Sequence, residues 1–287
     1  MASKQQAPPN PFKSYVGWIA RHAYWGVAIV MVALLFFPTN YVMERPGPTM
    51  NVLGKAVLNY GNKKVDLGGE AIEEGGSRAP SGPGALDIVT VNVVGSPSNS
   101  LPVFMAIANY FNPSSRLLPE EVVFPVGSSL ARDEKAQQNL MEGAKKAAKS
   151  AAASFLKSRG LPAGKVEEAK IKSGPIGGPS AGMVFALGLI EKATGENLTG
   201  GKNVAGTGTL ASSGKVGPIG GVASKMIAAR RDGASFFLAP AANCKQILSS
   251  RIPSGLRVVP VSSLSGALSS LKDISSGAFS LLPYCKA

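Results

Sequence analysis

The chain has 287 residues, of which 45% are hydrophobic and 16% charged, and it carries a formal net charge of +13. This length and composition are typical of one large or two modest folded domains and exclude a disordered chain. The positive charge is scattered, without zinc-finger spacing or a basic stripe interleaved with aromatic residues, so it indicates solubility and attraction to anionic lipid or wall polymer, and no nucleic-acid partner is expected.

The first predicted element is a hydrophobic segment near the amino terminus. Residues 1–22 are polar and basic, whereas residues 23–37 are all apolar or aromatic, and hydrophobic character resumes after a short break. Because a spanning helix needs about 20 residues, we predict an uncleaved transmembrane anchor over residues 23–43. A cleaved signal peptide is the alternative, but the residues that follow are too bulky or polar for a cleavage site. The basic residues before the anchor predict a cytoplasmic tail and an extracytoplasmic body at the cell membrane.

Residues 44–85 are expected to form an extracytoplasmic linker. It begins with a rigid turn at Pro46-Gly47-Pro48 and continues with one or two short strands in residues 52–65. Residues 68–84 are rich in Gly, Pro, Glu and Ser and predict a mobile loop. The alternating β-branched run Leu86–Val94 then predicts a strand.

The remaining elements are predicted from hydrophobic periodicity and from Gly and Pro boundaries. Helices are expected over residues 101–111, 132–159, 180–193, 222–231 and 264–271. Short strands are expected at residues 122–124, 166–172, 199–209, 235–239 and 256–261. The clearest helix is 132–159, where apolar residues recur every three or four positions opposite a lysine-bearing face. The tail from Ser275 is weakly specified.

A five-residue sequence occurs twice in the second half of the chain, each time before a predicted helix. The copies are Gly174-Pro175-Ile176-Gly177-Gly178 and Gly217-Pro218-Ile219-Gly220-Gly221. Ser180 follows the first copy, and Lys225 lies in the first helical turn after the second. A lysine can accept a serine proton only when it is neutral, and burial near a helix amino terminus lowers its pKa. We therefore predict a catalytic dyad with Ser180 as nucleophile and Lys225 as general base.

The backbone around the serine predicts an oxyanion site. The amides of Gly177, Gly178 and Ala181, near the amino end of the serine helix, could bind a developing negative charge. Glycine at the first two positions allows close approach of a substrate carbonyl. Taken singly, the serine turn is an ordinary helix start and a helical lysine is usually solvated. The combination favours catalysis.

The histidine and cysteine content narrows the chemistry further. His22 is the only histidine and precedes the hydrophobic segment, so Ser-His-Asp and Cys-His machinery is excluded downstream. Cys244 and Cys285 lack metal-ligand spacing, and no metal or cofactor is expected. They could form a disulfide if the body lies outside the cytoplasm, with two free buried cysteines as the alternative.

These motifs resemble those of the Lon protease family. Gly178-Pro179-Ser180-Ala181-Gly182 resembles its nucleophile motif, and residues 216–225 resemble its lysine motif. Thr207-Gly208 looks like its threonine–glycine pair, which implies that the Thr207 hydroxyl orients the lysine amine. The resemblance implies an α+β proteolytic domain akin to ribosomal protein S5 domain 2 over residues 86–274, followed by a tail over residues 275–287.

With the hydrophobic segment, the chain looks most like the membrane-anchored Lon-like proteases of Gram-positive bacteria. The resemblance implies a serine endopeptidase and a homo-oligomer in the form of a hexameric ring. Three features depart from the family pattern: Gly178 stands in place of an acidic residue, Thr209 stands in place of glutamate, and residues 158–173 leave no room for a PDZ domain.

No phosphate-binding loop is recognisable, because the nearest candidate, Gly195 to Asn203, is one residue too long and ends in asparagine. We therefore expect an ATP-independent enzyme that acts on unfolded, loosely folded or membrane-proximal proteins. A penicillin-binding type of enzyme is disfavoured, because Ser154…Lys157 and Ser212…Lys215 lack its companion motifs. The other alternative is a catalytically inactive Lon-like domain that binds peptide or anionic wall polymer.

Overall fold

The structure, a computed structural model, describes residues 11–73, 83–124 and 130–286. Its centre is an eight-stranded mixed sheet in the order β12-β11-β8-β5-β1-β2-β3, with β6 also paired to β1. The strands are β1 (Tyr41–Asn51), β2 (Lys55–Asn59), β3 (Lys64–Glu70), β5 (Ala85–Val94), β6 (Arg116–Pro119), β8 (Asn203–Gly206), β11 (Phe236–Pro240) and β12 (Arg257–Val261). The half from β12 to β5 is parallel, and the pairs that involve β1 and β2 are antiparallel.

Two short two-stranded sheets flank the central sheet. They pair β4 (Ile72–Glu73) with β7 (Lys170–Ile171), and β9 (Thr209–Leu210) with β10 (Val216–Gly217). The helices are α1 (Pro11–Leu35), α2 (Val103–Tyr110), α3 (Glu120–Val123), α4 (Leu130–Ser158), α5 (Gly164–Glu168), α6 (Gly182–Thr194), α7 (Val222–Arg231), α8 (Cys244–Leu248) and α9 (Leu264–Ser276).

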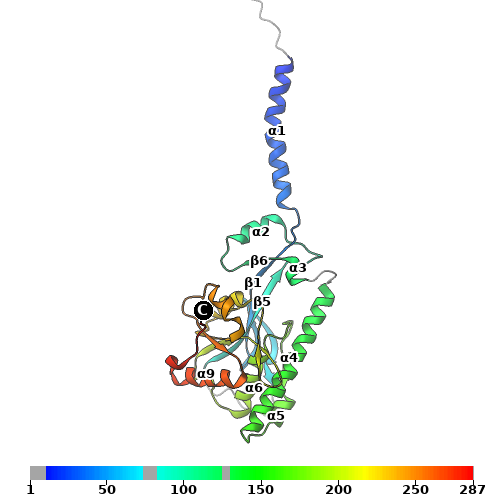
Figure 1. Cartoon of the computed structure of the whole chain (residues 1–287). Helices are drawn as coiled ribbons and strands as arrows, with labels where there is room; N and C mark the ends of the chain where they lie inside the picture. Colours follow the sequence, from blue (N-terminus) through cyan, green and yellow to red (C-terminus); the bar gives the residue numbers. More distant parts are fainter. Residues whose placement is uncertain (1–10, 74–82, 125–129, 287) are drawn as a thin grey trace, which may run out of the picture.

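Helices cover both faces of the central sheet. The larger hydrophobic core holds α6, α9 and the alanine-rich face of α4, with α4 packed beside α6 (Figure 1). The smaller core holds α7 and α8 against alternate residues of the same strands, such as Val89 and Phe237. Because successive strand residues point to opposite faces, one sheet supports both helical layers. The two helices predicted to carry Ser180 and Lys225 thus lie on opposite sides of the sheet.

Several predicted elements are confirmed with shifts of one to a few residues at their ends. The strand at Leu86–Val94 is β5, the helix over 132–159 is α4, and the helix over 222–231 is α7. The helix over 180–193 is α6, which ends as expected at Gly195 in the left-handed region, φ 71°.

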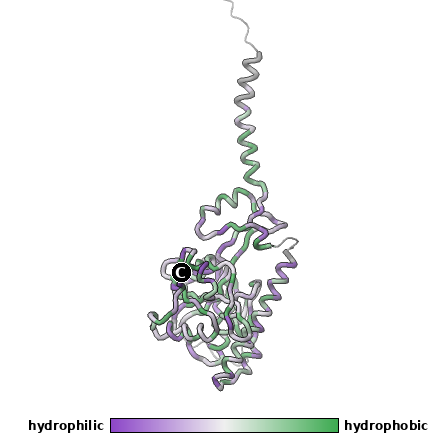
Figure 2. Tube along the Cα trace, viewed as in Figure 1, coloured by the Kyte–Doolittle hydropathy of each residue, from purple (hydrophilic) through white to green (hydrophobic). Residues whose placement is uncertain are grey.

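The hydrophobic amino-terminal segment differs from the prediction at its outer end. Helix α1 ends at Leu35, before Pro38, whereas residues 41–43 belong to β1, where Val42 and Met43 are fully buried. Proline cannot continue a helix, which accounts for the break. Helix α1 projects from the body, and its half nearest the body is strongly hydrophobic (Figures 1 and 2). Within the described part of the chain, no helix is long and apolar enough to cross a membrane.

Residues 44–70, predicted to be part of a linker, instead form the middle and one edge of the central sheet. Pro46-Gly47-Pro48 is not a free turn but an irregularity inside β1, where the register with β5 shifts between Pro46 and Thr49. Prolines are tolerated at such a bulge because it lacks regular ladder hydrogen bonds. Gly47 is needed there, since a Cβ would lie 2.8 Å from the backbone of Thr90.

Other predictions need smaller corrections. Residues 120–123 form helix α3 and not a strand, with Glu120 and Glu121 in its first turn, where acidic residues favour a helix start. Residues 166–172 are split between helix α5 and strand β7. The predicted loop over 68–84 contains the end of β3 and β4, and its central part, residues 74–82, lies outside the described residues. The tail is fixed by a Cys244–Cys285 disulfide and by buried Leu282.

Candidate active site

The first glycine turn positions Ser180 immediately before helix α6. Gly178 adopts φ +85°, a conformation that favours glycine, and Pro179 leads into Ser180. The backbone carbonyl of Ser180 accepts hydrogen bonds from Gly208 N at 2.7 Å and from Thr207 Oγ1 at 3.1 Å. These two bonds fix the serine backbone against the end of β8, while its side chain remains partly exposed to solvent.

The second glycine turn positions Lys225 in the first turn of α7. The lysine is 3% exposed, and its Nζ lies 3.0 Å from Ser180 Oγ and 3.2 Å from Thr207 Oγ1. Thr207 thus accepts from the lysine while it donates to the Ser180 carbonyl. The structure therefore brings together Ser180, Lys225 and Thr207, the three residues that the sequence singled out for catalysis.

The environment of Lys225 favours a neutral amine. Burial lowers the pKa of Lys225 to about 8, and the nearby negative charge of Glu44 acts in the opposite direction. A pKa near 8 leaves a useful fraction of the amine unprotonated around neutral pH. When Lys225 is neutral, the hydrogen bond with Ser180 can reverse, so that the hydroxyl donates its proton to Nζ. This arrangement is what a general base requires.

The predicted oxyanion donors differ in whether their N–H groups are already hydrogen-bonded within the protein. The Gly178 N–H donates to the backbone carbonyl of Gln137 in α4 at 2.8 Å, so in this structure it is not available to a substrate. Within the described residues, no hydrogen bond involves the N–H of Gly177, Ser180 or Ala181. These three backbone N–H groups belong to Ser180 itself or to residues within three positions of it, and they are available to a substrate.

A cleft of about 760 Å³ runs over the dyad. Residues 90–93 of strand β5 line this cleft, and residues of both glycine turns line it as well. Ser180 and Lys225 also line it, so a substrate in the cleft would reach both reactive groups. Among the described residues, no cluster of His, Cys, Asp and Glu could hold a metal ion.

Two residues near Lys225 were not found by sequence reasoning. Ser224 donates a hydrogen bond to Glu44 Oε1 at 2.7 Å, and both side chains are buried. The pair joins the amino end of α7 to strand β1. Glu44 lies outside the recognised motifs, at the start of the segment interpreted as a linker. Its only sequence signal is that it is the first acidic residue of the chain.

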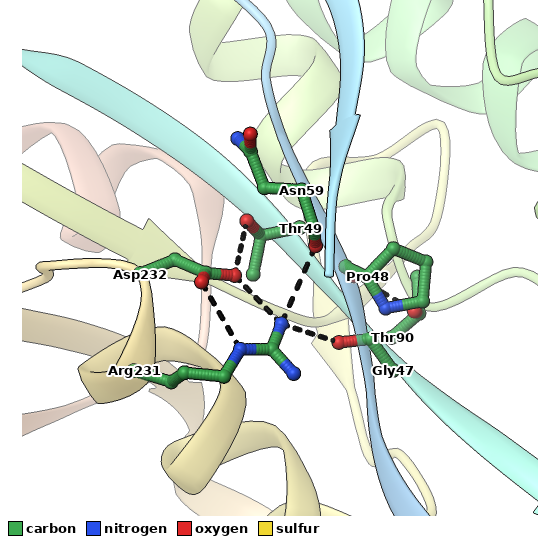
Figure 3. Close-up of polar contacts among 7 residues, drawn as sticks. All are labelled: Gly47, Pro48, Thr49, Asn59, Thr90, Arg231 and Asp232. Atoms are coloured by element: carbon green, nitrogen blue, oxygen red, sulfur yellow. Dashed lines mark hydrogen bonds and ion pairs between the residues drawn. The ribbon is translucent and has the colours of Figure 1, made fainter. Parts of the chain in front are cut away.

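The carboxyl end of α7 is attached to the same strand (Figure 3). Arg231 donates to the carbonyls of Gly47 at 2.9 Å and Asn59 at 3.3 Å, and it pairs with Asp232 at 2.7 Å. Asp232 in turn accepts from the Thr49 hydroxyl at 2.8 Å. Together with Ser224–Glu44, these contacts hold the lysine helix on β1 at both of its ends.

Part of the chain resembles known proteins. Residues 122–271, just over half of the chain, match the model of the Lon protease (S16) C-terminal proteolytic domain. The chain is 38% identical over 93 residues to a Lon protease of Neorickettsia sennetsu, which covers 32% of this chain and 11% of that protein. It is 40% identical over 86 residues to a mitochondrial Lon protease homolog of Drosophila melanogaster, which covers 29% and 8%. The chain thus matches only about a tenth of the length of these relatives.

Proposed function

This chain belongs to the Lon protease family, and we propose that it is a serine endopeptidase that uses Ser180 as nucleophile and Lys225 as general base. The observation that carries the proposal is the 3.0 Å separation of Lys225 Nζ and Ser180 Oγ, two atoms of residues that line one cleft. Lon is the family named by the matching model and by the relatives.

The proposed reaction begins when neutral Lys225 accepts the proton of the Ser180 hydroxyl. The serine oxygen attacks the scissile carbonyl, and the carbonyl oxygen becomes an oxyanion. The ammonium of Lys225 then gives the proton to the departing amine, which leaves an acyl ester on Ser180. A water molecule, deprotonated by the same amine, hydrolyses this ester and restores the serine.

Thr207 is proposed to orient the lysine amine. Its hydroxyl hydrogen is used by the Ser180 carbonyl, so its oxygen can only accept from Lys225. This fixed direction holds Nζ beside Ser180 Oγ. The free N–H groups of Ala181 and Gly177 are the proposed oxyanion donors, because Gly178 is already bonded to Gln137.

We propose that the enzyme acts without ATP on unfolded or loosely folded proteins. The support is the lack of a recognisable phosphate-binding loop in the 287 residues. A cleft that is not supplied by a motor can be reached only by chain segments that are already extended. The resemblance to Lon proteases supports the further proposals of a fold akin to ribosomal protein S5 domain 2 and a hexameric ring.

We also propose that the body lies outside the cytoplasm and that the amino-terminal segment holds it at the membrane. Two observations support this location. The side chains of α1 nearest the body are apolar and exposed, as at Trp25 and Met31, and a disulfide joins Cys244 and Cys285. Thiol trapping on freshly lysed cells tests the location: both cysteines should resist alkylation until a reductant is added, and immediate alkylation would contradict it.

The activity is tested with the full chain in detergent and casein as an unfolded substrate. Wild type should release peptides, and Ser180→Ala and Lys225→Ala should each abolish release. Ser212→Ala and Lys215→Ala are matched controls, because they alter the chance Ser-x-x-Lys pair outside the cleft. If wild type and both dyad variants behave alike, the domain is not an enzyme of this type.

A further inference from the structure

Glu44 is a buried carboxylate that lines the proposed substrate cleft. Among the described residues that line the cleft, only Glu44 and Lys225 are charged. Glu44 is 8% exposed, although acidic side chains are rarely buried without a cationic partner. The mechanism proposed above gives this carboxylate no role.

No cation in the described part of the chain forms an ion pair with Glu44. Ser224 donates to Oε1, but none of the ion pairs in the described part of the chain involves Glu44. The neighbouring Arg45 points elsewhere, since it donates to Met43 Sδ and to Asn109 Oδ1. Alternation along β1 places the two side chains on opposite faces of the strand.

The second carboxylate oxygen of Glu44 lies beside the second glycine turn. Gly221 has φ +66°, and a Cβ at this position would lie 3.2 Å from Glu44 Oε2. A Cβ at Gly220 would meet no atom within 4 Å. Glycine at position 221 therefore keeps a side chain away from Oε2, and Glu44, Gly220 and Gly221 all line the cleft.

The carboxylate also opposes the proposed base. Its negative charge raises the pKa of Lys225, whereas general-base catalysis needs the neutral amine. Among the described residues, the carboxylate of Glu44 thus has no cationic partner in an ion pair. In the free enzyme its charge also favours the protonated form of Lys225, which cannot act as a base. A positive group supplied by the substrate would remove both disadvantages, because it would pair with Oε2 and offset the field of Glu44 at Lys225.

We propose that Glu44 is a specificity-determining residue that binds a lysine or arginine side chain of the substrate next to the scissile bond. The inference rests on the proposed peptidase function and defines its substrate class as protein segments with a basic residue at that subsite. The preference is local, since a chain with net charge +13 otherwise repels cationic peptides.

The test maps the bonds cut in casein by the full chain and by Glu44→Gln, using mass spectrometry. Glutamine keeps an acceptor for Ser224, so the variant should fold. Wild type should cut next to lysine and arginine, and a peptide with lysine at that subsite should exceed its acetyl-lysine twin in kcat/KM by roughly tenfold, as expected for a charge-assisted hydrogen bond. In Glu44→Gln the ratio should fall to about one. Glu70→Gln, which removes a partly exposed carboxylate outside the cleft, should keep the wild-type ratio.

Identical cleavage maps for wild type and Glu44→Gln would overturn the proposal while leaving the peptidase function intact. If wild type cleaves nothing, the proposed peptidase function is wrong. The role of Glu44 can then still be tested by measuring peptide binding. The Ser180→Ala chain should then bind a casein peptide with free lysines about tenfold more tightly than the same peptide acetylated. Adding Glu44→Gln should remove the difference. Equal affinity for the two peptides in Ser180→Ala would overturn the proposal.

Discussion

Lys225 Nζ lies 3.0 Å from Ser180 Oγ, although the two residues are 45 positions apart, and helix α7, which holds Lys225, lies on the opposite face of the sheet from helix α6, which begins just after Ser180. Each helix begins at a glycine-rich turn, and the two turns meet at the cleft. The same five-residue sequence thus serves two purposes. One copy presents a partly exposed hydroxyl, and the other places an amine in a buried position that lowers its pKa.

The first prediction concerns pH. Because burial lowers the pKa of Lys225 to about 8, the neutral amine should increase as pH rises through that value. The kcat/KM for a neutral peptide should therefore rise between about pH 7 and 9 and level off above that range. A flat profile from pH 6 to 9 would count against lysine as the base.

The second prediction is that Lys225→Met stabilises the protein while abolishing cleavage. The folded pKa of about 8 lies below the ordinary value of 10.5, so the unfolded chain binds more protons between these two values. Wild-type stability should therefore rise with pH across this window, and below pH 8 the buried cation should cost up to roughly 3 kcal/mol. Thermal unfolding at pH 7 and at pH 10 should show a higher Tm for Lys225→Met mainly at pH 7. An equal rise in Tm at both pH values would contradict a lowered pKa of Lys225 in the folded protein.

The third prediction separates the hydroxyl of Thr207 from the packing of its side chain. Thr207→Val removes the hydroxyl but keeps the shape of the fully buried side chain, so kcat should fall by roughly 10- to 100-fold. Thr207→Ser keeps the hydroxyl and should retain most of the activity. If valine and serine behave alike, the threonine serves packing only.

The fourth prediction concerns the attachment of the lysine helix to β1. Arg231→Ala removes the donors to Gly47, Asn59 and Asp232, which should lower the free energy of unfolding by about 1 to 3 kcal/mol and reduce kcat. Within the described part of the chain, the side chain of its neighbour Arg230 donates a hydrogen bond only to the Ser254 carbonyl, so Arg230→Ala is the matched control. Denaturant unfolding and peptide kinetics measure both effects. Equal losses of stability and of kcat in the two variants would contradict the proposal that Arg231 holds the lysine helix on β1.

The fifth prediction concerns the carboxyl-terminal tail. Cys285→Ser removes the disulfide to Cys244, which links residues 41 positions apart, and should cost about 2 to 4 kcal/mol. Thermal unfolding with and without reductant measures this cost. Reductant should lower the Tm of wild type and leave that of Cys285→Ser unchanged.

The sequence was most informative where one local signal determined one element. Helix α7 was predicted with its observed ends, because a glycine turn precedes it and Asp232-Gly233 follows it. Ser180 and Lys225 were identified because the absence of a downstream histidine and the repeated turn restricted the choice of base, whereas Thr207 came from the resemblance to the Lon family. Their mutual distances required the fold.

The sequence was least informative where long-range pairing decides structure. Residues 44–70 were interpreted as a linker because Pro46-Gly47-Pro48 resembles a free turn, whereas β1 pairs with β5 on both sides of it. For this reason Glu44 was not predicted as a residue of the site, because its position at the cleft depends on the pairing of β1. The loss of Gly178 as a free donor likewise depends on Gln137, a residue of a distant helix.

The dyad is tested most directly by labelling the full chain with a fluorophosphonate, which reacts with activated serine hydroxyls. Peptide mapping should locate the label on Ser180, the labelling rate should titrate with an apparent pKa near 8, and Lys225→Ala should abolish the reaction. Labelling of Ser180 that is independent of pH and of Lys225, or labelling of a different serine in place of Ser180, would contradict the dyad.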